Sequence, residues 1–514
     1  MNGAESLVRT LVGGGVEVCF TNPGTSEMHI VGALDRAEGM RCVLGLFEGV
    51  VTGAADGYYR MRERPAATLL HLGPGLANGV ANLHNAKKAS SAIINIVGQH
   101  ATDHLKYNSP LSSDIEGVAR PVSAWLRTSA DARSLARDAA DAIAAATVRP
   151  GQIATLIVPA DAAWNAADGP ISVSPHAQAA AFSAGAVDGA ARVLKGEGPI
   201  LLLLGHGALR EEGLELASRI AGRTGCTVMA QGFNPRFARG AGRMPLARIH
   251  FNNDIARDML KDFRHIILVE ARDPVAFFAY PGKPSLLKSE GCAVHTLTEQ
   301  GDDTPGALRA LASAVGAKPS DIKPHVYAEI GKPAGAITYL SIAQAIAAAI
   351  PENAIIVDEA LTTGRGFLAP TAGARPHDWL QNMGGSIGFG TPVAAGAAIA
   401  CPDRRVIALE GDGSAMYTVQ ALWTHARESL NITTVVFANR SYEILKGEFA
   451  RLESGEPGRK ATDMLTLDRP AIDWIALAKG MGVPAVAVSR AEDLYSALEK
   501  ANASAGPSLI EVQM

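Results

Sequence analysis

The chain has 514 residues, of which 47% are hydrophobic and 19% charged, and its formal net charge at pH 7 is −4. This length predicts about three domains, and the composition is typical of a globular protein with a large core. The pI of about 6.4 indicates no basic surface for nucleic acid. We find no apolar run of about 18 residues and no signal-peptide pattern, so we expect no membrane interaction.

The cysteines give a second indication of the cellular setting. The five of them are scattered and form no CxxC pair. We therefore expect reduced, mostly buried thiols in a cytoplasmic protein.

Residues 1 to about 165 alternate short apolar runs with helical patterns. This alternation predicts a doubly wound α/β domain with a parallel sheet. A small, polar, Pro-containing stretch at about 165–185 then predicts a linker. The expected strands are 16–20, 43–46, 67–70, 93–97 and 154–158, and an Ala-rich helix is expected at 130–147.

Polar residues follow three of these strands directly. Asn22 and Thr25 follow the first strand, Glu48 the second and His71 the third. In an open parallel sheet, ligands bind beyond the carboxyl ends of the strands. Three of these residues also have a structural interpretation. Glu48 would compensate a helix dipole, Thr25 would cap a helix, and His71 would be a hydrogen-bonded structural group.

Residues 186–320 and 336–514 repeat the alternation, with a second linker at about 318–335. The middle region contains Gly205-His206-Gly207-Ala208 after a strand, but the full dinucleotide fingerprint is missing. The expected strands of the two regions are 200–204, 227–229, 265–269, 293–297, 354–357 and 509–512, and a helix is expected at 339–350.

The stretch Val406–Tyr442 predicts a strand (406–409), a sharp turn, a helix (417–427) and a second strand (432–438). Asp412 follows the first strand and Asn439 the second, 439 − 412 = 27 residues later. That spacing fits one βαβ crossover, so the two side chains would lie together. Carboxylate, amide and carbonyl oxygens suit Mg²⁺ or Ca²⁺, and the Gly-rich turn leaves room for a phosphate. An ordinary αβ turn is the alternative.

This stretch resembles the thiamine diphosphate motif, in which GDG is followed 25 to 30 residues later by an asparagine pair. Ala438 stands where the first asparagine usually does. LFEGVVTGAADGYYR and LLHLGPGLANG also resemble segments of that family, and the order of segments resembles its benzoylformate decarboxylase and acetolactate synthase branch. The resemblance implies a pyrimidine-binding domain (1–165), a central Rossmann-like domain (186–320) and a diphosphate-binding domain (336–514).

The resemblance assigns roles to individual residues. Glu48 would activate the cofactor through its aminopyrimidine ring, and His71 and Thr25 would assist catalysis. The implied metal ligands are Asp412, Asn439 and the Ser441 carbonyl. The implied cofactor contacts are Glu48, Thr362, Gly385, Ile387, Gly411, Gly413, Ser414 and Tyr442, and the implied substrate pocket is Asn22, Thr25, His71 and Leu445.

From the resemblance we expect a thiamine diphosphate- and Mg²⁺-dependent decarboxylase of a 2-oxo acid, acting through a C2 ylide and an enamine. The decarboxylase of the family has a second catalytic histidine where Ala279 stands, which argues against benzoylformate itself. The resemblance also implies a homodimer or homotetramer with sites at the subunit interface. We expect no bound FAD, because the flavin-contacting segments have no counterpart.

Several alternatives share the same cofactor residues. The first is an acetolactate synthase-type carboligase, and the second is a lyase that cleaves C–C bonds of acyloins or acyl-CoA compounds. A catalytically silent binding protein and a generic ATP- or NAD-binding α/β protein are alternatives from other classes. Intact Glu48, Asp412 and Asn439 argue against a silent protein.

Overall fold

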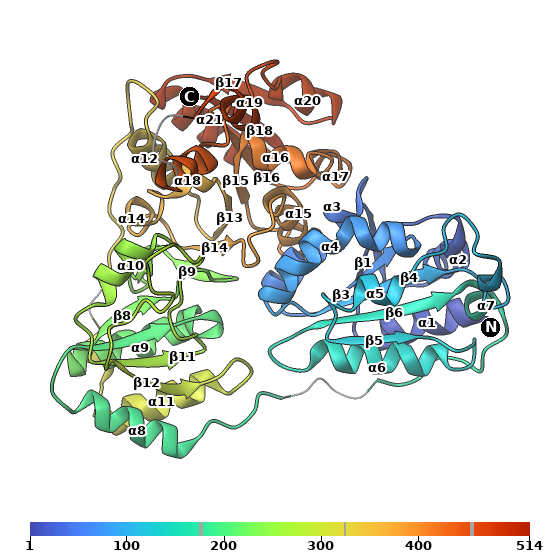
Figure 1. Ribbon diagram of the computed structural model, residues 1–514, viewed down its shortest axis with the longest axis horizontal. Coiled ribbons are helices and arrows are strands. Elements are labelled where there is room, and N and C mark those ends of the chain that lie inside the picture. The colour runs from blue at the N-terminus through green and yellow to red at the C-terminus, as the bar shows by residue number, and fades with distance from the viewer. Residues whose placement is uncertain (174–177, 323–324, 453–456) are drawn as a thin grey trace. The chain divides into compact units, whose positions relative to one another are not determined.

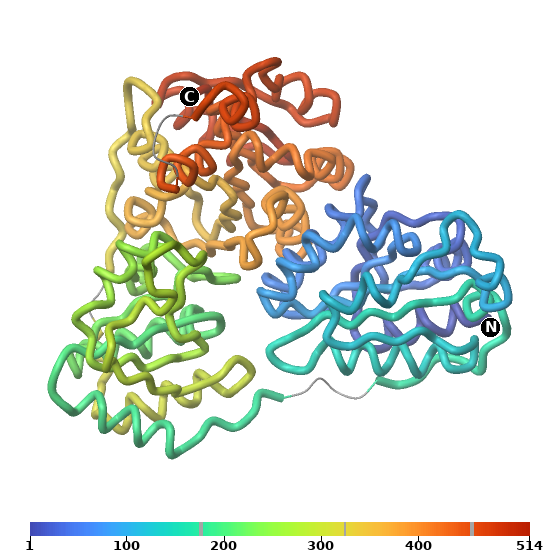
Figure 2. Tube along the Cα trace, in the orientation of Figure 1, coloured from blue at the N-terminus to red at the C-terminus, as the bar shows by residue number. Residues whose placement is uncertain are grey.

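The computed structural model describes residues 1–173, 178–322, 325–452 and 457–514 (Figure 1). They form three sheets, of six, five and seven strands, which confirms the predicted α/β class. The chain divides into two compact units. Unit 1 comprises Met1–Ala177, Gly331–Pro370 and Asn382–Met514, and unit 2 comprises Gln178–Ile330 and Thr371–Gln381. Both chain ends belong to unit 1 (Figure 2). The two predicted linkers include residues 174–177 and 323–324, which lie outside the described residues.

The first sheet of unit 1 has the parallel order β2-β1-β3-β4-β6-β5. Its central strands are apolar and buried, as expected for a sheet covered on both faces. Five strands match predicted ones within two residues at either end, and the sixth, β5, is an addition. The bounds are β1 (Val18–Asn22), β2 (Arg41–Leu44), β3 (Ala66–Leu70), β4 (Ile93–Gln99), β5 (Trp125–Thr128) and β6 (Ile153–Pro159).

Helices cover both faces of this sheet (Figure 1). On one face, α1 and α6 pack together through buried apolar side chains such as Leu7, Leu11, Leu135 and Ile143. On the other face, α3 and α4 lie side by side. The helices here are α1 (Gly3–Gly13), η1 (Thr25–Glu27), α2 (Met28–Asp35), α3 (Glu48–Arg62), α4 (Leu72–Lys88), η2 (Leu105–Tyr107), α5 (Ile115–Ala119), α6 (Leu135–Thr147) and α7 (Ala160–Trp164).

The third sheet contributes five parallel strands to unit 1, in the order β17-β18-β16-β15-β13. Their bounds are β13 (Ala354–Glu359), β15 (Val406–Gly411), β16 (Ile432–Ala438), β17 (Ala485–Val488) and β18 (Ser508–Gln513). The helices are α12 (Tyr339–Ala349), α13 (Leu361–Gly364), α14 (Leu368–Thr371), α15 (Gly390–Ala400), α16 (Asp412–Ala415), η5 (Met416–Thr418), α17 (Ala421–Arg427), α18 (Glu443–Leu452), α19 (Arg459–Leu465), α20 (Trp474–Gly480) and α21 (Ala491–Ala503).

Within unit 1, α3 packs tightly along α15, every residue of which is buried. Glycines make this close approach possible. A Cβ on Gly57 would lie 2.1 Å from the Val393 carbonyl oxygen, and one on Gly396 would lie 1.9 Å from that of Ala54. No larger residue fits at either position, because backbone occupies the space. Asn82 donates to the carbonyls of both Gly49 and Gly388, which places the start of α3, next to Glu48, beside the segment that precedes α15.

Unit 2 contains a five-stranded parallel sheet of order β10-β8-β7-β11-β12. It also contains β9 and β14, which pair antiparallel. The bounds are β7 (Ile200–Leu204), β8 (Thr227–Ala230), β9 (Phe237–Arg239), β10 (Ala247–Arg248), β11 (His265–Val269), β12 (Ala293–Thr298) and β14 (His377–Gln381). The helices are α8 (Ala184–Leu194), η3 (His206–Leu209), α9 (Glu211–Thr224), α10 (Asn253–Leu260), α11 (Thr304–Val315) and η4 (Pro319–Asp321).

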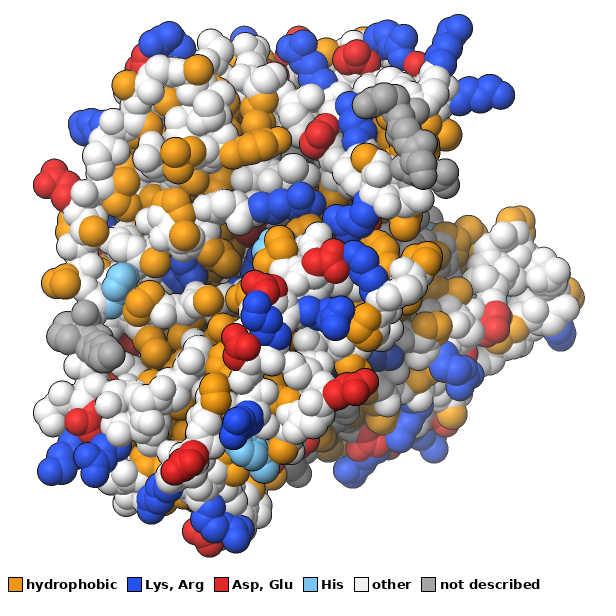
Figure 3. Space-filling model, turned by 60° about the vertical axis from the view of Figure 1, so that its left-hand side comes forward, with side chains coloured by type: hydrophobic (Ala, Val, Ile, Leu, Met, Phe, Trp, Pro, Cys, Tyr) orange, Lys and Arg blue, Asp and Glu red, His pale blue; other side chains and the backbone are white. Residues whose placement is uncertain are grey.

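The remaining features of the fold are its surface charges and its thiols. Acidic and basic side chains are interspersed on the face in Figure 3, in line with the small net charge. Among the described residues, no helix combines the length and apolarity needed to cross a membrane. All five cysteines are free, but only Cys19 and Cys292 are buried and Cys42 is exposed. The expectation of mostly buried thiols is therefore wrong.

Candidate active site

The first group of predicted site residues gathers at the carboxyl ends of β1, β2 and β3. Asn22 pairs with Leu70 across β1 and β3, so His71, which follows β3, lies close to the end of β1. A Cβ on Gly24 would lie 2.1 Å from the His71 ring. Only glycine fits there, because the imidazole occupies the space. The strand register therefore brings the residue before Thr25 against His71.

His71 is held by the carboxylate of Glu27, which was not among the predicted site residues. Its Nδ1 lies 2.8 Å from Glu27 Oε2, and the same oxygen accepts a hydrogen bond of 2.8 Å from the Gly24 amide. The Glu27 side chain is fully buried, whereas that of His71 is 22% exposed. A carboxylate on Nδ1 orients the ring and leaves Nε2 as the nitrogen free to exchange a proton. This Glu27–His71 pair is the arrangement of an oriented acid–base histidine.

Glu48 is the first residue of α3 and is partly exposed. Its Oε2 accepts a hydrogen bond of 3.0 Å from Asn78 Nδ2 on α4. A Cβ on Gly75 would lie 3.2 Å from Glu48 Oε1, so a glycine here leaves space around that oxygen. Glu48 is therefore a held carboxylate with one oxygen left for a ligand, and not only a counter-charge for the helix dipole.

The second group lies at the carboxyl ends of β15 and β16. The Asp412 carboxylate accepts hydrogen bonds from the Arg440 amide at 2.6 Å and the Gly413 amide at 2.9 Å. Asn439 Oδ1 accepts one of 3.0 Å from the Ser441 amide. The predicted metal ligands Asp412, Asn439 and Ser441 are thus brought together. Burial raises the pKa of Asp412, while the two amides oppose that shift.

This oxygen set differs from a histidine or cysteine metal site. The described residues contain no cluster of three or more His, Cys, Asp or Glu suited to a metal. One carboxylate, one amide oxygen and one carbonyl instead fit a hard cation that keeps additional ligands, as Mg²⁺ does. The residues present therefore fit the metal that the resemblance implies.

Beside the metal loop, small residues and hydroxyls form a cradle. A Cβ on Gly413 would lie 2.5 Å from the Tyr442 ring, so Tyr442 packs directly on the glycine turn. Ser414 Oγ donates to the carbonyls of Gly411 at 3.0 Å and Glu359 at 3.2 Å. Thr362 Oγ1 is buried and has no hydrogen-bond partner among the described residues. A diphosphate oxygen bound here would give this buried hydroxyl a hydrogen-bond partner.

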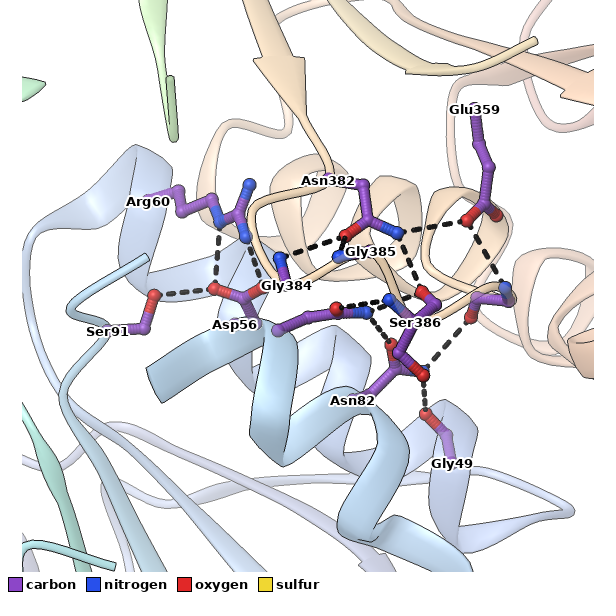
Figure 4. Close-up of polar contacts among 12 residues, drawn as sticks. Gly49, Asp56, Arg60, Asn82, Ser91, Glu359, Asn382, Gly384, Gly385 and Ser386 are labelled. Atoms are coloured by element: carbon purple, nitrogen blue, oxygen red, sulfur yellow. Dashed lines mark hydrogen bonds and ion pairs between the residues drawn. The ribbon is translucent and has the colours of Figure 1, made fainter. Parts of the chain in front are cut away.

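The segment Asn382–Gly390, here called the cofactor loop, contains Gly385 and Ile387. Asn382 Oδ1 accepts hydrogen bonds from the amides of Gly384 and Gly385, at 3.1 and 2.8 Å. The Glu359 carboxyl accepts three more, from the amides of Gly388, Phe389 and Gly390 at 2.9–3.2 Å. The loop is thus a fixed feature, and Figure 4 shows part of it, with Asn382, Gly384, Gly385 and Ser386 labelled.

Glu359 is itself unusual, because it lies beside a second buried carboxyl. It pairs with Glu410 across β13 and β15, and the two are 2% and 0% exposed. Burial raises the pKa of Glu359 to about 7, although the loop amides oppose the shift. Burial and the neighbouring Glu359 raise the pKa of Glu410 well above its usual value. Burial of the two carboxyls side by side therefore favours their protonated forms.

The remaining predicted residues lie outside these clusters. Thr25 is exposed and lines an open cavity of about 470 Å³ together with His29, His100, His104 and Trp164. Neither Glu48 nor His71 lines that cavity. Leu445 lies on α18 and is 47% exposed. The structure thus brings the predicted cofactor residues into the clusters, whereas the predicted substrate residues Thr25 and Leu445 lie outside them.

Comparisons with known proteins identify the family. Residues 1–118 match the model of the thiamine pyrophosphate enzyme N-terminal TPP binding domain, and residues 367–512 match that of the C-terminal one. The chain is 49% identical to the "Putative acetolactate synthase large subunit IlvX" of Mycobacterium tuberculosis, over 100% of this chain and 99% of that protein. It is 29% identical to the benzoylformate decarboxylase of Pseudomonas aeruginosa, over 97% of this chain and 96% of that protein.

A solved structure agrees with these relatives. The thiamine diphosphate-dependent 4-hydroxybenzoylformate decarboxylase of Rhodococcus jostii RHA1 superposes with a TM-score of 0.86 and 25% identity, covering 100% of this chain and 99% of that one. The chain therefore belongs to the thiamine pyrophosphate enzyme family. It is an enzyme of the decarboxylase and carboligase group within it.

Proposed function

We propose that the protein is a thiamine diphosphate- and Mg²⁺-dependent enzyme that acts on a 2-oxo acid and joins the acyl fragment to a second carbonyl, as an acetolactate synthase does. One observation carries this choice, namely the 49% identity, over the whole chain, to the M. tuberculosis relative named for that activity. From the sequence alone, a decarboxylase is the first candidate and this carboligase the second.

The residues of the site have distinct tasks in this proposal. Asp412, Asn439 and the Ser441 carbonyl would hold Mg²⁺, and Ser414 and Thr362 would bind the diphosphate. When bound, thiamine diphosphate supplies a carbon nucleophile and an electron sink for the 2-carbonyl group. Glu48 Oε1 would exchange a proton with the cofactor's pyrimidine ring, while Asn78 holds Oε2. Ile387 and the Gly385 carbonyl would support the same ring.

The Glu27–His71 pair favours a second candidate, a decarboxylase that protonates the acyl fragment and releases an aldehyde. His71 Nε2 would give and take the proton at the substrate, because Nδ1 is engaged by Glu27. Benzoylformate decarboxylase and 4-hydroxybenzoylformate decarboxylase relatives, at 29% and 25% identity, support this candidate more weakly than the carboligase is supported. Both candidates share the cofactor residues.

We also propose that the working enzyme is at least a dimer. Large apolar side chains are exposed next to the site residues on both sheets: Leu46 at 44%, Leu361 at 37% and Tyr417 at 55%. Water contact with such side chains is unfavourable, and covering them in a subunit interface removes it. A dimer or tetramer with sites at that interface fits their positions.

Product analysis separates the two candidates. The purified protein, with thiamine diphosphate and Mg²⁺, would be given pyruvate, 2-oxobutyrate, branched-chain 2-oxo acids and benzoylformate, while CO₂ and carbon products are measured together. A carboligase forms a 2-hydroxy-2-alkyl-3-oxo acid, with one CO₂ released per two substrate molecules. A decarboxylase forms one aldehyde per CO₂. Absence of CO₂ with every acid would refute both candidates.

A further inference from the structure

Side chains of helix α4 bond three alternate residues of the cofactor loop, Gly384, Ser386 and Gly388. Figure 4 shows Asn82 of this helix beside the loop. His84 Nε2 lies 3.1 Å from the Gly384 carbonyl oxygen, Asn85 bonds Ser386, and Asn82 bonds the Gly388 carbonyl at 3.0 Å. The intervening residues are Gly385 and Ile387, the two that are expected to contact the cofactor ring. The loop is thus held through the residues that alternate with its cofactor contacts.

Asn85 makes the strongest of these attachments. Its Nδ2 donates to the Ser386 carbonyl at 2.8 Å, and its Oδ1 accepts from the Ser386 amide at 3.1 Å. The two bonds fix both backbone groups of Ser386, which lies between Gly385 and Ile387. Asn85 is fully buried, so water cannot replace these bonds without opening the packing.

Asn82 connects the loop to the helix that carries Glu48. Its Nδ2 donates both to the Gly388 carbonyl and, at 2.8 Å, to the carbonyl of Gly49, the residue after Glu48. Its Oδ1 accepts a hydrogen bond of 3.1 Å from Asn85 Nδ2. The two asparagines therefore form one continuous network from the start of α3 to the cofactor loop, with all donors in use.

We propose that Asn85 is a positioning residue for the cofactor loop. Through Ser386 it sets the conformation of Gly385 and Ile387. Through Asn82 it keeps these two residues at a fixed position relative to Glu48. The assignment of Gly385 and Ile387 as cofactor contacts rests on the proposed function. Asn85 itself touches neither the substrate nor the reacting atoms. Its role is to hold the loop ready before the cofactor arrives, which lowers the ordering cost of binding.

The test compares Asn85→Ala with Asn95→Ala in the full-length protein. Asn95 is a matched control, because it is also fully buried in the same domain and bonds the hydroxyls of Thr68 and Thr155. Two readouts are measured: amide hydrogen exchange of residues 382–392 without cofactor, and the dissociation constant of thiamine diphosphate with Mg²⁺. The first does not depend on enzyme activity.

We expect Asn85→Ala to speed exchange in the loop and to weaken cofactor binding, each by about 10- to 100-fold, as the loss of its three buried hydrogen bonds, two to Ser386 and one to Asn82, implies. Asn95→Ala should change both by less than about 3-fold, even where it lowers the melting temperature equally. Asn85→Ser replaces the alanine variant if that one does not fold. Equal effects of the Asn85 and Asn95 variants, or failure of both Asn85 variants to fold, would overturn the proposal.

The outcome is separable from that of the proposed function. If the wild-type protein binds no thiamine diphosphate, the proposed function fails. The exchange measurement on the cofactor-free protein would still show whether Asn85 holds the loop. If the wild type binds the cofactor but loop exchange is unaffected by Asn85→Ala, the inference about Asn85 fails alone.

Discussion

Replacing Glu27 by glutamine tests whether the Glu27–His71 pair works as a unit. In the wild type, Glu27 Oε2 serves both His71 Nδ1 and the Gly24 amide, while Oε1 is buried without a partner among the described residues. If the glutamine oxygen takes the Oε2 position, its NH₂ group is buried unsatisfied. If the amide is reversed, the NH₂ group faces the Gly24 N–H and donates to Nδ1. Either arrangement is unfavourable.

The magnitude follows from the bond that is lost. A hydrogen bond to a charged group contributes about 1.5–3 kcal/mol, and an unsatisfied buried group costs about 1–3 kcal/mol. We therefore expect Glu27→Gln to lower kcat/KM by about 10- to 100-fold on the preferred 2-oxo acid and to destabilise the fold by about 1–3 kcal/mol. Steady-state kinetics and urea unfolding measure the two effects.

A double-mutant cycle supplies the control. If Glu27 acts through His71, the double variant Glu27→Gln/His71→Asn should be no slower than His71→Asn alone. Nitrogen-15 NMR of the His71 ring should also show the proton on Nδ1 in the wild type and a changed tautomer population in Glu27→Gln. Additive losses, with the His71 tautomer unchanged, would refute the reasoning.

Two further predictions concern the metal and the buried carboxyls. Removal of Mg²⁺ with EDTA should weaken thiamine diphosphate binding at least about 10-fold. In Asp412→Asn, the thiamine diphosphate affinity measured by calorimetry should no longer depend on Mg²⁺. An undiminished Mg²⁺ response in that variant would contradict the ligand assignment. The folded state binds the Glu359 proton more tightly than the unfolded chain, because burial raises that pKa from 4.5 to about 7. This difference adds about 3 kcal/mol to the free energy of unfolding below pH 4.5, and the contribution is lost as pH rises through 7. Urea unfolding across this range should show the decline, and Glu359→Gln, which removes the titrating carboxyl, should flatten it. A flat wild-type profile would count against the assignment.

Long apolar strands were predictable from the sequence. The predicted and observed bounds of β7, β11 and β16 coincide, because buried parallel strands are continuous apolar runs between turn residues. Several other strands were not predicted, among them β5 and β17. β5 and β17 lie at sheet edges and are largely unburied, so their sequences lack that signal.

One helix prediction was partly wrong for a related reason. The pattern at 417–427 predicted one helix, but the chain forms η5, a break and then α17 at Ala421–Arg427. Apolar spacing indicated which face is buried but not the irregular turn after the glycine-rich segment.

The site residues also fall into those that were predicted from the sequence and those that were missed. Asp412, Asn439 and Glu48 were selected because each follows a strand, and the parallel strands of one sheet end at the same edge. Ser441 was selected through the family resemblance. Glu27, Asn82 and Asn85 were missed. In sequence they read as ordinary polar residues of a helix start or a helix surface, and Asn85 meets Ser386 only through the packing of segments 301 residues apart. No local pattern carries such a contact.

The most direct test of the central claim compares wild-type protein with Glu48→Gln for CO₂ release from 2-oxo acids, with and without thiamine diphosphate. We predict that the wild type releases CO₂ from at least one acid only with the cofactor. Glu48→Gln should still bind the cofactor but lose turnover by about 100-fold or more, since its amide cannot exchange the proton. Unchanged turnover in Glu48→Gln, or turnover that needs no cofactor, would contradict the claim.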